Sequence, residues 1–185
     1  MALAPTRELD CETCRIRSWR VGDEAALARH ANSRAVWLNL RDRFPHPYTL
    51  KHAEAWVRFA PAQDPETNFA IEVAGEAVGA VGFVLHDDVE RSSAEIGYWL
   101  GEAVWGRGIA TAAVRAATEY AFRTYALTRV YAVPFERNRA SCRVLEKAGY
   151  VLEGRLRRSA VKDGQVLDQM LYAITDLDPR PHSSR

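Results

Sequence analysis

The glycine-rich segment GRGIAT at 106–111 constrains this chain more than any other part of its sequence. It follows a strand-like run over 94–100 and begins a helix of small residues that we expect to reach about Tyr125. The first turn of a helix leaves its backbone N–H groups unpaired, and the helix dipole adds partial positive charge there. Glycines let an anion approach because they have no Cβ atom. The order of strand, glycine-rich turn and helix therefore predicts a site for a phosphorylated cofactor.

Two familiar nucleotide-binding motifs differ from this turn. A dinucleotide site needs G-x-G-x-x-G near the start of a βαβ unit, and here Gly106 and Gly108 have no third glycine at that spacing. A P-loop needs Gly-Lys followed by Ser or Thr, which the chain does not contain. The turn by itself does not identify one phosphorylated ligand. Other segments of the sequence are needed to indicate which ligand binds there.

Length and charge set the general class of the protein. The 185 residues fit one domain, which we expect to span 1–178 before a disordered tail over 179–185. A formal net charge of +1 argues against nucleic-acid binding through bulk electrostatics. Because no apolar run could cross a membrane and the start lacks a hydrophobic signal region, we predict a cytoplasmic protein without membrane contact.

The three cysteines do not predict a metal or redox centre. Cys11 and Cys14 form a CxxC within the predicted first strand, but no second CxxC or matching histidine pair follows. Cys142 lies beside Ser141 on a predicted helix, where a small buried residue is a better interpretation than a nucleophile. We therefore expect neither a metal site nor a cysteine acyl carrier.

The pattern of apolar residues predicts an α/β (α+β) fold of about seven strands and four to five helices. Asp23, Thr49 and Asn138 are placed to cap helices with their side chains. Two prolines within 44–49 predict an extended loop there. The predicted strands cover 15–19, 68–74, 77–85, 94–100, 128–134, 150–157 and 166–174, and the predicted helices cover 23–31, 34–40, 49–59, 109–125 and 138–148.

The second half of the chain resembles the GNAT superfamily of acyl-CoA-dependent N-acyltransferases. The segments that match in order and spacing are EIGYWL at 95–100, WGRGIAT at 105–111, NRAS at 138–141, EKAGY at 146–150 and EG at 153–154. Together they are similar to the RimJ/RimL-type ribosomal-protein N-terminal acetyltransferases. The resemblance implies a GNAT fold, with a mixed and mostly antiparallel sheet splayed between its fourth and fifth strands, and acetyl-CoA as the cofactor.

The same resemblance implies how coenzyme A is held. In this family the pantetheine arm lies between the splayed strands, and the pyrophosphate lies at the glycine-rich turn. Trp105 departs from the Gln or Arg that usually begins the motif, and Arg107 could add a charged contact to the phosphates. The cofactor-binding residues carried over to this sequence are Trp99, Leu100, Trp105, Gly106, Arg107, Gly108, Ile109, Ala110, Thr111, Asn138 and Ser141.

Acetyl transfer needs a neutral amine and stabilisation of the leaving thiolate. By the family layout, Glu95 is the candidate base, although it could simply pair with an arginine, and His46 is the alternative. Ser141 is the candidate hydrogen-bond donor to the thiolate, although it could serve only the helix cap with Asn138. Many relatives use a tyrosine acid at the position that is Leu145 here.

The acceptor side of the site is predicted less specifically. The family layout makes Trp37, Phe44, His46 and Tyr48 the candidate substrate-binding residues, although so many rings could equally close the core. Neutralising a lysine amine at pH 7 costs about 4.6 kcal/mol, whereas an α-amine of pKa near 8 costs about 1.4 kcal/mol. A site with a single candidate base favours the α-amine.

We therefore predict an N-acetyltransferase that transfers acetyl from acetyl-CoA to a primary amine by direct attack in a ternary complex. The expected acceptor is the α-amine of a protein N-terminus. A small-molecule amine acetyltransferase and a non-catalytic acyl-CoA sensor are the alternatives. Homodimers are common in the resembled branch, but the sequence contains no decisive interface.

Overall fold

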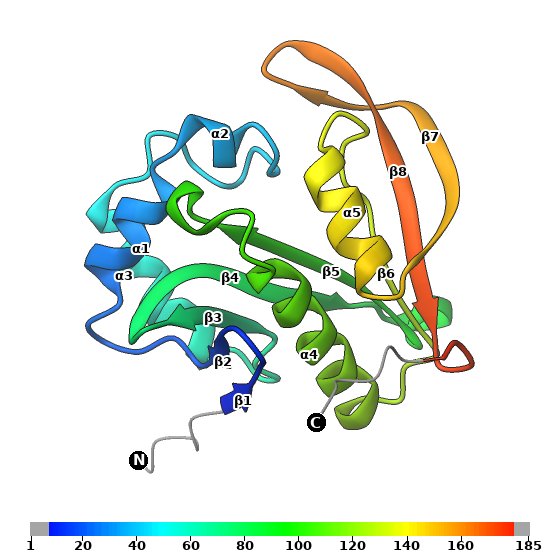
Figure 1. Ribbon diagram of the computed structural model, residues 1–185, viewed down its shortest axis with the longest axis horizontal. Coiled ribbons are helices and arrows are strands. Elements are labelled where there is room, and N and C mark those ends of the chain that lie inside the picture. The colour runs from blue at the N-terminus through cyan, green and yellow to red at the C-terminus, as the bar shows by residue number, and fades with distance from the viewer. Residues whose placement is uncertain (1–7, 180–185) are drawn as a thin grey trace.

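One sheet of eight strands, in the spatial order β1-β2-β3-β4-β5-β6-β8-β7, organises the computed structural model, which describes residues 8–179 (Figure 1). The strands are β1 (Glu8–Asp10), β2 (Arg15–Arg17), β3 (Asn68–Val73), β4 (Glu76–Leu85), β5 (Ser93–Leu100), β6 (Arg129–Ala132), β7 (Val151–Lys162) and β8 (Gln165–Thr175). The helices are α1 (Glu24–Ala31), α2 (Arg34–Trp37), α3 (Leu50–Phe59), α4 (Ile109–Thr124) and α5 (Arg139–Lys147). Every strand pair is antiparallel except β5 with β6, which confirms the predicted fold class.

Helices cover both faces of the sheet (Figure 1). The larger apolar core joins α4 and α5 to one face, and a smaller core joins α1 and α3 to the other. Alternation along β5 feeds both cores, because Ile96 and Leu100 belong to the first and Trp99 packs against the second. The strand that resembles the family's cofactor strand is therefore fixed from both sides.

The sheet opens between β5 and β6. β5 pairs with β4 from Ala94 to Leu100, but it pairs with β6 only at Ser93–Glu95. Residues 96–100 of β5 therefore present one backbone edge that no strand of the described chain covers. At the closed edge, Gly79 of β4 has no room for a side chain, since an added Cβ would lie 2.3 Å from the Trp99 carbonyl oxygen. The expected splay is confirmed.

Several predicted boundaries were wrong. The sequence pattern missed β1, which pairs with β2 and places Cys11 and Cys14 in the turn between them instead of within a strand. The helix expected over 34–40 ends at Trp37, and the last hairpin is longer than expected at both strands. The predicted tail lies, from residue 180 onward, outside the described residues.

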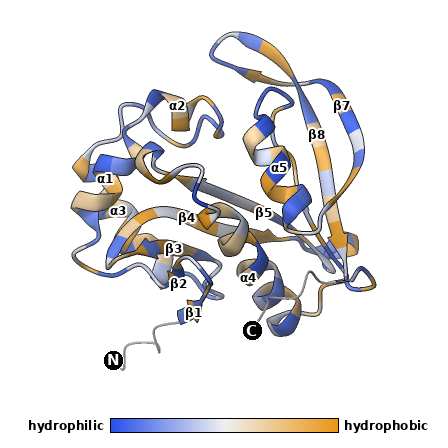
Figure 2. Ribbon diagram, in the orientation of Figure 1, coloured by the Kyte–Doolittle hydropathy of each residue, from blue (hydrophilic) through white to orange (hydrophobic). Residues whose placement is uncertain are grey.

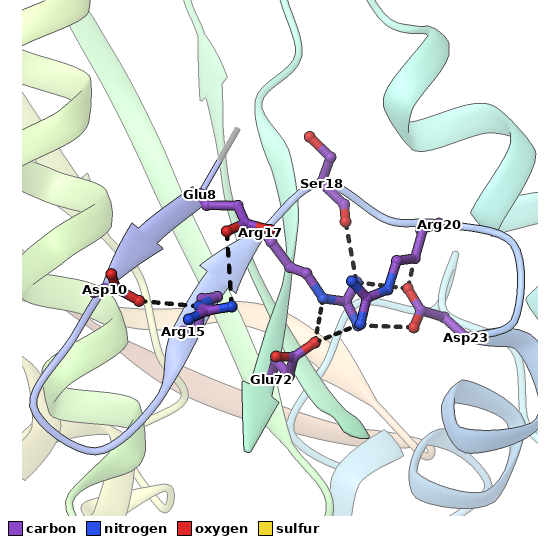
Figure 3. Close-up of polar contacts among 8 residues, drawn as sticks. All are labelled: Glu8, Asp10, Arg15, Arg17, Ser18, Arg20, Asp23 and Glu72. Carbon is purple, nitrogen blue, oxygen red and sulfur yellow. Dashed lines mark hydrogen bonds and ion pairs between the residues drawn. The ribbon is translucent and has the colours of Figure 1, made fainter. Parts of the chain in front are cut away.

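A buried ionic cluster ties β2, β3 and the start of α1 together (Figure 3). Arg17 is completely buried and donates to both carboxylate oxygens of Asp23, at 2.7 and 2.8 Å. Its Nε donates to Glu72 of β3 at 2.5 Å, and Arg20 also donates to Glu72, at 2.9 Å. The prediction that Asp23 caps α1 with its side chain was wrong, because the carboxylate is held by Arg17. The caps by Thr49 and Asn138 are confirmed.

The β7–β8 hairpin extends away from the central sheet and carries hydrophobic residues along both strands (Figures 1 and 2). Several of these side chains are exposed: Val151, Leu152, Leu156, Val161 and Val166. The base of the hairpin continues the sheet through β8 and β6. The free end of the hairpin contacts other parts of the chain and forms one wall of the site described next.

Candidate active site

A cavity of about 1010 Å³ lies where β5 and β6 part. Its walls come from β4, β5, the first turn of α4, α5, the segment 39–45 and the end of β7. This volume is at the upper end of the range for small-molecule sites, so a long ligand fits. The cavity joins the glycine-rich turn and the uncovered edge of β5 in one continuous space.

The glycine-rich turn forms an anion cradle at one end of the cavity. Gly106 and Gly108 have φ angles of 75° and 77°, a region that suits glycine, and an added Cβ at either would meet nothing within 4 Å. The helical hydrogen bonds of α4 begin with Ala112, whose N–H donates to the Gly108 carbonyl at 3.1 Å. The N–H groups of residues 109–111 precede that bond and line the open turn. This geometry fits a diphosphate.

Trp105 joins the cradle to the splayed strand. Its indole N–H donates to the Leu100 carbonyl at 2.8 Å, which fixes the start of the turn against the end of β5. Trp99 lines the cavity nearby and meets the edge of the Phe44 ring, with the ring centroids 5.5 Å apart. The cavity lining includes every predicted cofactor-binding residue.

Asn138 and Ser141 lie on the opposite wall, at the start of α5. The Asn138 carbonyl oxygen accepts from the Ser141 N–H at 3.2 Å, which caps the helix and leaves the side-chain amide as a donor. Leu145 is fully buried in the core, so the position of the family's tyrosine carries no proton donor. Ser141 itself is half-buried and lines the cavity.

The sequence argument missed Tyr98, which reaches Ser141 from β5. Its hydroxyl lies 2.8 Å from Ser141 Oγ and 3.1 Å from the Ser141 carbonyl oxygen. Burial raises the pKa of Tyr98 far above its ordinary value, so the phenol keeps its proton. Strand alternation could have placed Tyr98 on the same face as Ile96 and Leu100, but no local pattern reveals a partner 43 residues away.

Glu95 lines the cavity and forms an ion pair with Arg41, which lies in the loop after α2. Its side chain is only a quarter exposed. The arginine pairing considered from the sequence is therefore present, and a role as base would require Glu95 to act beside a guanidinium. Its role as a base stays a prediction.

The predicted acceptor residues divide into two groups. Phe44 and Tyr48 line the cavity, and burial raises the pKa of Tyr48 to about 12. Trp37 and His46 stack on each other, with centroids 5.5 Å apart, and lie outside the lining. They support the loop rather than face the cavity.

Lys162, at the end of β7, is a cavity residue that the sequence did not suggest. Its side chain is almost completely buried, with Nζ 3.7 Å from the centroid of the Trp37 ring and 2.7 Å from Asp42 Oδ1. Arg34 of α2 also pairs with Asp163 in the hairpin turn, at 2.7 Å. The hairpin therefore reaches across to the α2 segment and lies over the end of the cavity that the segment 39–45 lines.

Within residues 8–179 no group of three or more His, Cys, Asp and Glu side chains could hold a metal ion. In the same part of the chain, no helix is both long and apolar enough to cross a membrane.

Comparison with known proteins assigns a family to this arrangement. Residues 14–151 match the family model described as an acetyltransferase (GNAT) domain. "Probable N-acetyltransferase YjcK" from Bacillus subtilis is 37% identical over 118 residues, 63% of this chain and 65% of that protein. Spermidine N(1)-acetyltransferase from Escherichia coli is 29% identical over 141 residues, 73% of each chain.

Solved structures share the fold. Mycobacterium smegmatis RimJ in complex with CoA-disulfide superposes with a TM-score of 0.78, at 28% identity, over 92% of this chain and 87% of that one. The curated matches are partial, since the chain covers 65% of YjcK and between 54% and 58% of three further Bacillus N-acetyltransferases.

Proposed function

The chain belongs to the GNAT acetyltransferase family, and on that premise we propose that it transfers an acetyl group from acetyl-CoA to the α-amine of a protein N-terminus. The observation that carries the proposal is that one cavity joins the glycine cradle of α4 to the uncovered edge of β5. A diphosphate and an extended amide-containing arm need these two features side by side.

The residues that would hold coenzyme A follow from that geometry. The cradle N–H groups at 109–111 would hold the diphosphate, and Arg107 would add positive charge at the same end of the cavity. The backbone of 96–100 offers donors and acceptors to the pantetheine amides, and Asn138 offers its side-chain amide from the opposite wall. When bound, acetyl-CoA supplies the activated acetyl thioester.

The chain's own groups would then serve acyl transfer. Backbone N–H groups on the open edge of β5 can polarise a carbonyl without any particular side chain. Glu95 would take the proton from the attacking amine, and Ser141 would donate a hydrogen bond to the leaving sulfur. Both side chains line the same cavity, on opposite sides of the gap between β5 and α5.

The charges of the lining favour an acceptor with one amine. Asp42 and Glu95 are the acidic residues of the lining, and each already pairs with a cation, Lys162 and Arg41 respectively. A polyamine would need carboxylates that are free to meet several ammonium groups. The similarity to spermidine N(1)-acetyltransferase nevertheless makes a polyamine the second candidate acceptor.

The test is release of free thiol from acetyl-CoA on addition of matched amines. One peptide carries a free α-amine and no lysine, its pair has a blocked N-terminus and one lysine, and spermidine is the third acceptor. We expect release with the first peptide alone. Release with only the lysine peptide or only spermidine contradicts the α-amine assignment, and coenzyme A binding without any turnover indicates the sensor.

A further inference from the structure

The geometry points to a positioning residue on β5: Tyr98 orients the Ser141 hydroxyl so that its proton faces the sulfur of coenzyme A. This inference rests on the proposed function, because it assumes that the thiol arm lies between β5 and α5. The hydroxyl pair joins the two walls of the cavity across the gap.

The two hydroxyls can share their protons in two ways. In one arrangement Tyr98 donates to Ser141 Oγ over 2.8 Å, and the serine proton is free to face the cavity. In the other, Tyr98 donates to the Ser141 carbonyl oxygen at 3.1 Å, and the serine proton is directed back to the tyrosine oxygen. A negatively charged sulfur in the cavity stabilises the first arrangement because it accepts a hydrogen bond from the serine hydroxyl.

Tyr98 is suited to orient the serine rather than to lose its own proton. Burial holds the pKa of this phenol far above that of a thiol, so transfer of its proton to a thiolate would be strongly uphill. The side chain packs at the edge of the main core, which fixes the ring. The hydroxyl therefore has a fixed place and a fixed role as donor.

The reaction balances without a proton from Tyr98. The amine nitrogen forms a bond to the acetyl carbon, and the carbon–sulfur bond breaks with its electron pair on sulfur. One proton leaves the amine, and one proton ends on sulfur. Ser141 donates a hydrogen bond to sulfur while the charge develops, and Tyr98 donates to Ser141 at the same time.

The test measures the ionisation of bound coenzyme A, independently of turnover. Calorimetric titration of the whole chain at pH 8, in two buffers of different ionisation enthalpy, counts the protons released on binding. Desulfo-coenzyme A, which lacks the thiol, gives the background. If the serine proton faces the sulfur and stabilises the thiolate tenfold, the pKa of the bound thiol falls by about one unit, and coenzyme A releases more protons on binding than this analogue does.

We expect Tyr98→Phe and Ser141→Ala each to reduce that difference in proton release, and the double variant to match Ser141→Ala alone. The matched control is Tyr150→Phe, because the Tyr150 hydroxyl lies 2.6 Å from Thr118 Oγ1 in a similar buried pair away from the cavity. This control should release protons as the unmodified chain does. In the kinetic assay, kcat of Tyr98→Phe should fall about tenfold with KM for acetyl-CoA nearly unchanged.

Two results would overturn the inference. One is unchanged proton release in Tyr98→Phe, and the other is an effect of Tyr98→Phe that persists in the Ser141→Ala background. Ser141→Ala tests the pair from the α5 side if Tyr98→Phe fails to fold. A different failure, in which the unmodified chain does not bind coenzyme A at all, overturns the proposed function as well.

Discussion

Two polar clusters of this molecule, one buried and one half-buried, differ in how fully their members are paired. The Arg17 cluster lies under β2 and β3, where every guanidinium nitrogen donates to a carboxylate and Arg20 adds a second cation to Glu72. The hydroxyl pair of Tyr98 and Ser141 lies on the cavity wall, with one more proton and more lone pairs than the pair itself uses. The charges of the first cluster are paired within the chain, whereas the second has hydrogen-bonding capacity left for a ligand.

This difference in pairing implies that the Arg17 cluster serves the stability of the fold and the Tyr98–Ser141 pair serves the reaction. A buried ion cluster holds elements together, because loss of its central cation leaves carboxylates buried without that partner. A neutral pair beside a cavity contributes less to folding but can respond to a charge that arrives. Variants of each cluster should therefore affect different measurements.

Arg17→Met should have the largest effect on stability. It removes the cation from between Asp23 and Glu72 and leaves both carboxylates buried, which we expect to lower the free energy of unfolding by about 3–5 kcal/mol. Urea denaturation followed by circular dichroism measures the loss. Arg123→Ala is the control, because its pair with Glu119 is exposed and should be worth less than about 0.5 kcal/mol. A loss below about 1 kcal/mol for Arg17→Met would mean that the cluster does not stabilise the fold more than an ordinary hydrogen bond does.

Gly108→Ala should affect ligand binding and stability together. The left-handed φ of 77° makes alanine strained by about 1–2 kcal/mol. We expect the new methyl group to lower the affinity for coenzyme A at least tenfold, on the order of 1.4 kcal/mol, because it takes up space in the cradle. Calorimetry measures the affinity and thermal unfolding measures the strain.

Gly75→Ala is the matched control for the cradle. Gly75 has a φ of 84° in the turn between β3 and β4, and an added Cβ there also meets nothing within 4 Å. Its stability should fall by a similar amount, with unchanged affinity for coenzyme A. Equal loss of affinity in both variants would show that strain, rather than the cradle, sets binding.

Tyr98→Phe should lower the free energy of unfolding only slightly. The loss of one neutral hydrogen bond should cost about 1 kcal/mol in unfolding free energy, several times less than Arg17→Met. Tyr150→Phe should cost about the same, because it breaks a similar pair in the core. Denaturation of both variants under identical conditions checks this. A loss as large as that of Arg17→Met would make the hydroxyl pair a structural element.

The smallest effect should come from the surface pair of Arg129 and Glu153, whose two hydrogen bonds measure 2.7 and 2.5 Å. The hydrogen bond from Arg129 holds the pKa of Glu153 below its ordinary value of 4.5. The pair therefore contributes its stability above about pH 4.5 and loses it as the pH falls through the lowered pKa.

Glu153→Gln should cost less than about 1 kcal/mol at pH 7, and its difference from the unmodified chain should close progressively below pH 4.5. Unfolding temperatures measured from pH 7 to pH 3 test this. A difference that grows at low pH would contradict the assigned direction.

Features carried by local patterns could be predicted from the sequence. The strand at 94–100, the glycine turn and the long helix after it are continuous in the chain, and the cap by Asn138 involves a residue only three positions away. The splay between β5 and β6 came from the family resemblance, and it is confirmed. These features define the cofactor end of the cavity.

Features that depend on distant partners could not be predicted. Asp23 has the right residue type for a cap, but Arg17 binds its carboxylate more strongly than a backbone N–H would. β1 has only three residues and exists because β2 pairs with it, so its own pattern gives little signal. Lys162 contacts Asp42 across 120 positions, which no periodicity can indicate.

The contact of Lys162 with Trp37 and Asp42 makes the gap between β5 and β6 part of a closed ring. The two halves of the sheet separate at one side and are rejoined at the other, where the Lys162 ammonium lies above the Trp37 ring and Arg34 pairs with Asp163. Any widening of the gap must move that ammonium across the indole or detach it, and must stretch the pair of Arg34 with Asp163. Trp37 emission would then register how far the two halves move apart when a ligand enters between them.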